Sequence, residues 1–212
     1  AKYFFNKKKL NKSIRFLLIP ETIGSIAYIN KNFKKLKKNV IGGYVLTCIG
    51  DEKNYSYLFS KYKNSLSDKC ALKAFNDLGY KFKSYSFLER GSDERQFNSP
   101  YIDLEIGSIM RSKYNTYKEY HTSLDNLKII SEKGLLGGFK VSKKAIENLL
   151  IANEKNFKTQ RTISNQNIIS KIVCEPNLGK RDLYPKISQK DNNYFFSKNL
   201  LNFLQYSDGT NN

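Results

Sequence analysis

Short apolar runs of strand length alternate along this chain with amphipathic segments of helix length, and this alternation limits the folds open to it. "SIRFLLIP" (residues 13–20) is almost wholly apolar, as expected of a strand buried on both faces. Further strands are predicted within "NVIGGYVLTCIGD" (39–51), "KFKSYSFLE" (81–89) and "LEIGSIMR" (104–111). The alternation predicts an α/β fold with a mixed or parallel sheet covered on both sides.

Helices are predicted between and after these runs. "SLSDKCALKAFNDLGY" (65–80) begins with Ser and Asp, spaces its apolar residues as a helix does, and ends at Gly79. A longer helix follows Ser131, where Gly137 and Gly138 favour a kink or close packing. "ETIGSIAYINKN" (21–32) predicts a short helix or turn, and "YFFSKNLLNFLQYSDG" (194–209) a short helix.

Four polar clusters follow predicted strands: Glu21–Thr22, Asp51–Glu52, "RGSDERQF" (90–97) and "EYHTSLD" (119–125). In α/β folds, the carboxyl ends of the strands collect the reactive residues. These clusters therefore predict a metal-binding or catalytic cleft at one edge of the sheet.

The chain is strongly basic, with 37 Lys and Arg against 19 Asp and Glu and a formal net charge of +18. Such a charge would attract a polyanion. The basic residues are mostly scattered, however, and no aromatic RNA-binding signature accompanies them, so nucleic acid is not the partner we expect. Three widely spaced cysteines fit a reducing, cytoplasmic compartment, and no apolar run approaches the ~20 residues of a membrane span.

From its two ends, we expect this chain to be a piece of a longer protein. The only methionine is Met110, and the last residues are "SDGTNN". We expect residues 1–160 to be the C-terminal portion of an α/β domain. Residues 161–212 would be a turn-rich extension with a short helix that leads towards a missing domain.

Several of these stretches resemble one bacterial aminopeptidase-like family. The resemblance rests on "RFLLIPETIGSIAYI", "GGYVLTCIGD", "RGSDERQF", "IGSIMRSKY" and "EYHTSLDNL", which occur in order, and "CEPNLGKRDLYP" and "LLNFLQYSDGTN" extend it. The family is often encoded near polysaccharide-biosynthesis genes and is related to zinc-dependent leucyl aminopeptidases. The resemblance implies a three-layer α/β/α fold with a mixed, largely parallel sheet and a zinc cleft at the strand ends.

The same resemblance implies metal-binding roles. His121 would be a zinc ligand, with Asp125 as the carboxylate that orients its imidazole. A further ligand would be Asp51, which we prefer, or Cys48. Without the resemblance, an exposed His beside Thr and Ser is a solvated or capping residue, and Asp51 only ends a strand in a Gly-Asp turn.

Catalytic and substrate-binding roles follow from two other motifs. Glu21 in "PET.G" matches the general base that deprotonates a zinc-bound water, or in another register is itself a ligand. Asp93 in "GSDE" would position water or the substrate amine. Glu94, Arg95 and Tyr120 would contact the substrate. The alternatives from the residues alone are a helix N-terminal acid for Glu21 and a cap for Asp93.

Two expected family features are missing. No upstream segment resembling "CHP…DN.SG" supplies the first histidine and bridging aspartate, so one or two zinc ions would need a longer chain. A winged-helix-like domain would follow "YSDGTN". The first hypothesis is a zinc-dependent hydrolase of a peptide or amide-containing small substrate, able to form a homo-oligomer and not bound to a membrane. The alternatives are an inactive remnant or binding module of the same fold, and a basic polyanion-binding protein.

Overall fold

The sheet of this protein is mixed and has four strands. The computed structural model describes residues 1–7, 10–153, 168–183 and 193–210. The strands are β1 (Gly43–Leu46), β2 (Ser56–Leu58), β3 (Lys83–Tyr85) and β4 (Ile106–Met110), in the order β1-β4-β2-β3. β1 pairs with β4 and β2 with β3 in parallel, whereas β2 and β4 are antiparallel.

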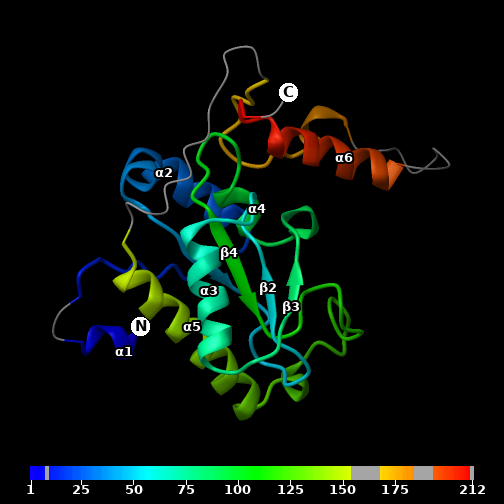
Figure 1. The fold of residues 1–212 in the computed structure, drawn as a ribbon. Coiled ribbons are helices and arrows are strands. Elements are labelled where there is room, and N and C mark those ends of the chain that lie inside the picture. Colours follow the sequence, from blue (N-terminus) through cyan, green and yellow to red (C-terminus); the bar gives the residue numbers. More distant parts are fainter. Residues whose placement is uncertain (8–9, 154–167, 184–192, 211–212) are drawn as a thin grey trace.

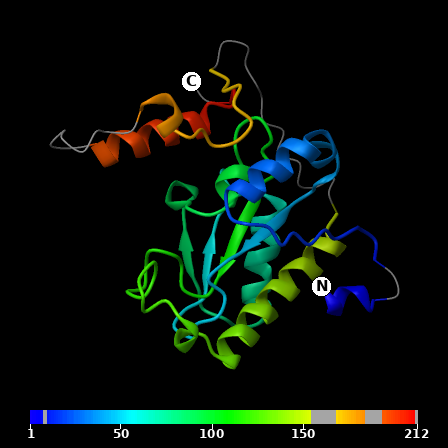
Figure 2. The same cartoon turned by 180° about the vertical axis from the view of Figure 1, so that it is seen from behind.

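Helices cover both faces of this sheet (Figures 1 and 2). On one face, α3 (Leu66–Asp77) and α5 (Glu132–Ile151) pack over Tyr57 and Ile109. On the other face, α2 (Ile23–Asn39) and α4 (Glu94–Phe97) pack over Ile106. Ile106 and Ile109 point to opposite faces because they are an odd number of residues apart on one strand. The predicted three-layer α/β/α fold, with a mixed and largely parallel sheet, is confirmed.

The two helices of the first face begin where the sequence predicts. Ser65 caps α3 by accepting a hydrogen bond from Asp68 N, and Asp68 completes a capping box. Ser131 caps α5 by accepting a hydrogen bond from Gly134 N. A Cβ on Gly134 would lie 2.0 Å from Gly50 O, so this glycine lets α5 approach the backbone that follows β1.

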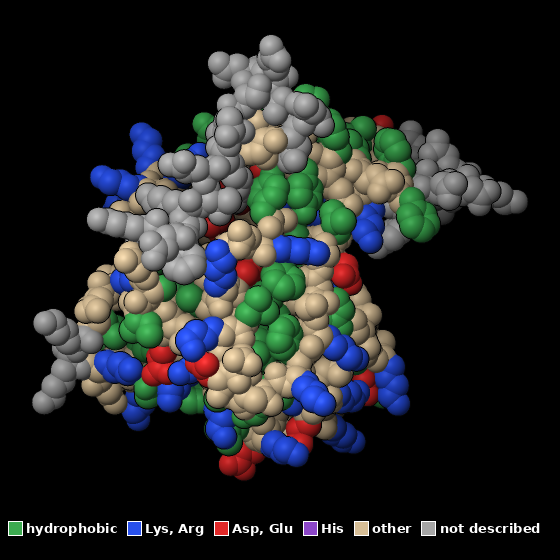
Figure 3. All heavy atoms as spheres, viewed as in Figure 1, with side chains coloured by type: hydrophobic (Ala, Val, Ile, Leu, Met, Phe, Trp, Pro, Cys, Tyr) green, Lys and Arg blue, Asp and Glu red, His purple; other side chains and the backbone are tan. Residues whose placement is uncertain are grey.

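The remaining helical elements are short or lie near the chain ends. They are α1 (Lys2–Phe5), α6 (Asn193–Tyr206) and the 3-10 turns Phe87–Glu89, Leu127–Ile129 and Gly179–Arg181. Among the residues described, no helix combines the length and apolar character needed to cross a membrane. Lys and Arg side chains are spread over the face drawn in Figure 3, with Asp and Glu among them.

The C-terminal segment, by which we mean residues 168–183 and 193–210, packs against the α/β layers. Lys61, whose side chain is 1% exposed, forms a salt bridge with Asp208 at 2.9 Å. Arg90 forms a second buried salt bridge with Glu175 at 2.8 Å. The predicted boundary between residues 160 and 161 lies outside the described residues.

Three elements differ from the sequence-based expectation. Residues 13–20 form no strand, and Leu18 is 99% exposed, so the prediction of a buried strand is wrong: no described strand pairs with this segment. The predicted short helix or turn after it is the 17-residue helix α2. The three-residue strand β2 was not predicted.

Candidate functional site

The candidate site lies beyond the carboxyl ends of β1 and β4. These strands are parallel, so the residues that follow them, Cys48 after β1 and Tyr120 after β4, reach the same edge of the sheet. The packing of α2 on α4 adds Glu21, just before α2, and the loop that carries Asp93. Only the clusters after β1 and β4 arrive by the predicted strand-end rule, because residues 13–20 form no strand and β3 runs antiparallel to β4.

Tyr120 is the point at which these loops meet. Burial raises the pKa of the Tyr120 hydroxyl, and the charges of Cys48, Glu21 and Asp125 raise it further, while Arg95 lowers it. These four side chains come from four separate parts of the chain, and each acts on the pKa of one phenol. Tyr120 is therefore protonated at neutral pH and able to donate a hydrogen bond.

Tyr120 also supports His121. The two rings stack with their centroids 4.0 Å apart. His121 is exposed and has a φ of 56°, a backbone conformation uncommon for residues other than glycine. No hydrogen bond joins His121 to Asp125 in the described part of the chain.

Asp51 joins the two strand ends. Its Oδ1 accepts hydrogen bonds from Lys53 N and Ser112 Oγ, both at 2.8 Å, and its Oδ2 accepts one from Ser112 N at 2.7 Å. Cys48, the alternative ligand, lies with its Sγ 3.5 Å from the hydroxyl of Tyr117. The carboxylate of Asp51 is thus engaged by protein donors, as the Gly-Asp turn alternative expects.

Asp93 and Arg95 hold the start of α2. Asp93 Oδ1 accepts hydrogen bonds from Thr22 N at 2.7 Å and Ser25 Oγ at 2.8 Å. Arg95 Nη2 donates to Thr22 Oγ1. The side chain of Asp93 therefore accepts hydrogen bonds from the start of α2. The capping alternative had expected it to cap the following helix, α4, to which it makes no side-chain cap hydrogen bond. Thr22 and Ser25 were not singled out in the sequence, because only the packing of α2 on α4 brings them to Asp93.

Glu94 is the first residue of α4 and is fully buried. It accepts hydrogen bonds from Gly91 N, Ser92 N, Ser108 Oγ and Tyr114 Oη, all within 2.8–2.9 Å. The carboxylate of Glu94 thus has four hydrogen-bond donors within the protein itself.

The described residues do not form a metal site on their own. No group of three or more His, Cys, Asp or Glu side chains within them is arranged to hold an ion. Zinc sites in proteins use three or four such donors. His121 is placed to supply one, but Asp51 and Asp93 already accept hydrogen bonds from neighbouring protein groups.

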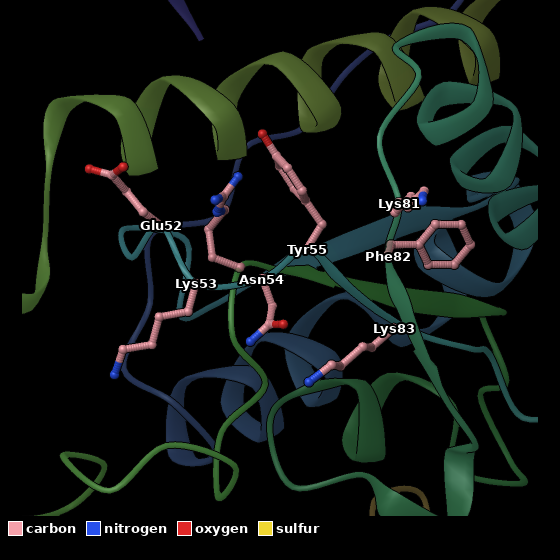
Figure 4. Close-up of a pocket in the computed structure, with 8 residues that line it drawn as sticks. Glu52, Lys53, Asn54, Tyr55, Lys81, Phe82 and Lys83 are labelled. Carbon is pink, nitrogen blue, oxygen red and sulfur yellow. The ribbon is translucent and has the colours of Figure 1, made fainter.

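Two cavities in the described part of the structure lie elsewhere. One, of about 370 Å³, lies at the start of β2 and β3. Figure 4 shows Glu52 and Tyr55 on the side of α5, whereas Asn54 and Lys83 point the opposite way. The other, of about 380 Å³, lies between Lys37 and Asp208. Neither is lined by Glu21, Asp93, Tyr120 or His121.

Comparison with known proteins finds two family profiles. Residues 1–153 match one described as "Domain of unknown function (DUF4910)". Residues 166–212 match one described as "winged helix-turn-helix". The expectation that a winged-helix region lies wholly beyond this chain is therefore corrected.

Individual relatives are considerably longer than this chain. A Clostridium acetobutylicum protein described as "Putative polysaccharide biosynthesis protein with aminopeptidase-like domain" is 39% identical over 206 residues, covering 97% of this chain and 44% of its own length. The crystal structure of a "putative peptidase" from the same organism has a TM-score of 0.58 and 35% identity, covering 91% of this chain and 39% of that one.

A zinc aminopeptidase of Bacillus subtilis, BSAP, is a more distant structural neighbour. It has a TM-score of 0.51 and 17% identity, and the match covers 65% of this chain and 36% of that one. At this identity the likeness shows a shared fold. This chain thus spans less than half the length of the relatives that it matches.

Proposed function

This chain belongs to the family described as "Domain of unknown function (DUF4910)", and we propose that its candidate site takes part in the hydrolysis of amide bonds. The substrate would be a peptide or a small molecule that contains an amide. The observation that carries the proposal is the hydrogen bonding of Asp93 and Arg95 to Thr22, which brings both beside Glu21. Glu21 and Arg95 also act on the pKa of the Tyr120 hydroxyl. The relative with an aminopeptidase-like domain supports the same class of reaction.

Each of these groups has a task that suits its chemistry. Glu21 is an exposed carboxylate at the start of α2, so it can take the proton of an attacking water. Tyr120 stays protonated and can donate a hydrogen bond to the amide oxygen as negative charge develops there. Arg95 keeps a partly exposed guanidinium beside them, which suits a substrate carboxylate.

Zinc is part of the proposal only with donors from outside the described residues. His121 is our proposed ligand, because it is exposed at the site and makes no hydrogen bond in the described part of the chain. Elemental analysis of the purified protein, with His121→Ala beside it, tests this assignment. Equal zinc content in the two proteins would contradict the role of His121.

Hydrolysis is tested with an aminoacyl-p-nitroanilide and three proteins. We expect Glu21→Gln to lower kcat by about 100-fold with little change in KM, as expected for the loss of a general base. Glu132→Gln, which alters an equally exposed glutamate at the start of α5, is the matched control and should keep full activity. Equal rates for the parent chain and Glu21→Gln would contradict the proposed base.

A non-catalytic binding module of the same fold is the second candidate. It is favoured by the absence of a three-donor metal cluster from the described residues and by the engagement of Asp51 and Asp93. This candidate predicts that the chain binds an aminoacyl amide by calorimetry but releases no product above the buffer rate.

A further inference from the structure

Thr22 carries a strained backbone beside the proposed base. Its φ is 62°, a left-handed conformation that a β-branched residue rarely adopts. Such a residue persists only where its surroundings hold it. The side chains that do so are Asp93, through Thr22 N, and Arg95, through Thr22 Oγ1. The position of Glu21 therefore depends on this clamp.

Arg95 is itself held by the C-terminal segment, from about 80 and 110 residues further along the chain. Glu175 Oε1 lies 3.7 Å from Arg95 Nη1. Gln205 Nε2 donates to Arg95 O at 2.9 Å and to Glu175 Oε2 at 2.9 Å. Both side chains therefore contact Arg95 from a segment that is distant from it in the sequence.

This contact is buried and firmly anchored. The Glu175 side chain is 7% exposed, and its Oε2 also accepts a hydrogen bond from Arg90 Nε at 2.8 Å. Gln205 is fully buried. Glu175 N further donates to the side chain of Gln96, the residue after Arg95. A buried carboxylate that is paired in this way is costly to displace, so it can transmit a displacement of its segment to its partners.

We propose that Glu175 and Gln205 are positioning residues, through which the C-terminal segment sets the conformation of Thr22 and the placement of Glu21. A displacement of this segment, for example by a ligand of the winged-helix region, releases Arg95 and lets Thr22 relax to a negative φ. The consequence for catalysis rests on the proposed function, whereas the effect on Thr22 does not.

The test reads the Thr22 amide directly, by hydrogen exchange in the full chain. We expect Glu175→Gln to speed exchange at Thr22 by about tenfold, because one side of its clamp is loosened. Tyr206→Phe is the matched control: it removes a hydrogen bond from the same segment to Lys61 O, 3.1 Å long, and leaves the side chains of Glu175 and Gln205 intact. It should leave exchange at Thr22 unchanged.

Three outcomes overturn the proposal: no change at Thr22 in Glu175→Gln, an equal change in Tyr206→Phe, or no change in Gln205→Ala. Gln205→Ala decides the matter alone if Glu175→Gln does not fold. Exchange is measurable in an inactive protein, so a failure of the proposed hydrolysis is distinguished from a failure of this inference. Where hydrolysis is present, Glu175→Gln should lower kcat and leave KM unchanged, whereas Tyr206→Phe should change neither.

Discussion

At the scale of single residues, buried carboxylates hold the loops that carry the candidate site. Glu94 is the plainest case, because its two oxygens accept four hydrogen bonds and water does not reach them. We expect Glu94→Ala to lower the free energy of unfolding by about 3–5 kcal/mol, because it leaves buried donors without a partner. Urea unfolding measures this. The exposed Glu21→Ala should change it by less than about 0.5 kcal/mol, and equal values would show that Glu94 is not structural.

Asp208 gives the stability of this protein a pH dependence at acid values. Burial alone raises the pKa of Asp208, but hydrogen bonds from Thr210, Tyr62 and Lys61 outweigh it and lower the pKa from 3.8 to about 2. The stabilisation is therefore complete above pH 3.8 and is lost as the pH falls through about 2, and it amounts to about 2 kcal/mol. We expect the midpoint temperatures of thermal unfolding of the parent chain and of Asp208→Asn to become equal as the pH falls from 3.8 to about 2. A constant difference in midpoint would contradict the shift.

The sequence predicts which residues gather at the site better than it predicts what they do there. Cys48 and Tyr120 follow from the rule that parallel strands end at one edge. Glu21 follows no strand and is brought there by the packing of α2 on α4. The tasks of Asp93 and Arg95 do not follow from that rule, because both side chains turn towards Thr22 only after α2 has packed on α4. Contacts between segments so far apart leave no local pattern in the chain.

At the scale of the elements, the apolar character of residues 13–20 does not make them a buried strand. Apolar composition states what a segment could bury, whereas a strand also requires a neighbour to pair with. β4 has neighbours on both sides and is buried along its whole length. The helices were predicted more accurately because their caps and periodicity are local, as Ser65 and Ser131 illustrate.

Leucine substitutions distinguish the two kinds of segment. We expect Leu18→Ala to change the free energy of unfolding by less than about 0.5 kcal/mol, since the side chain is already exposed. The same substitution at Leu58, which is fully buried in β2, should cost about 2–5 kcal/mol. Chemical denaturation of both variants provides the comparison. A large loss at Leu18 would restore the buried-strand interpretation.

Close packing between α5 and the turn after β1 depends on a glycine. Alanine favours helices by about 1 kcal/mol over glycine, so Gly134→Ala would stabilise an isolated α5. In the folded chain its Cβ would meet Gly50 O at 2.0 Å and push the helix away from the turn that carries Asp51. We therefore expect a net loss of at least about 1–3 kcal/mol in urea unfolding. Lys140→Ala, on the exposed side of α5, should cost nothing, and a stabilised Gly134→Ala would refute the contact.

At the scale of the whole molecule, two family profiles meet in one packed structure. The profiles match residues 1–153 and 166–212, which taken alone would predict two independent units. The described C-terminal segment instead contributes Glu175 and Asp208 to buried salt bridges with Arg90 and Lys61. Neither pairing was predicted from the sequence, because no local pattern relates residues more than 80 positions apart.

This shared packing predicts that the molecule unfolds as one unit. If the C-terminal segment unfolded alone, Lys61 would be left as a buried charge without Asp208 as its partner. Unfolding of this segment alone therefore costs nearly as much free energy as complete unfolding. Scanning calorimetry should therefore give a single transition whose calorimetric and van't Hoff enthalpies agree. Asp208→Asn should move that transition to a lower temperature without dividing it. If the C-terminal segment were an independent unit, the same substitution would instead produce a separate transition at low temperature while the main transition stayed in place.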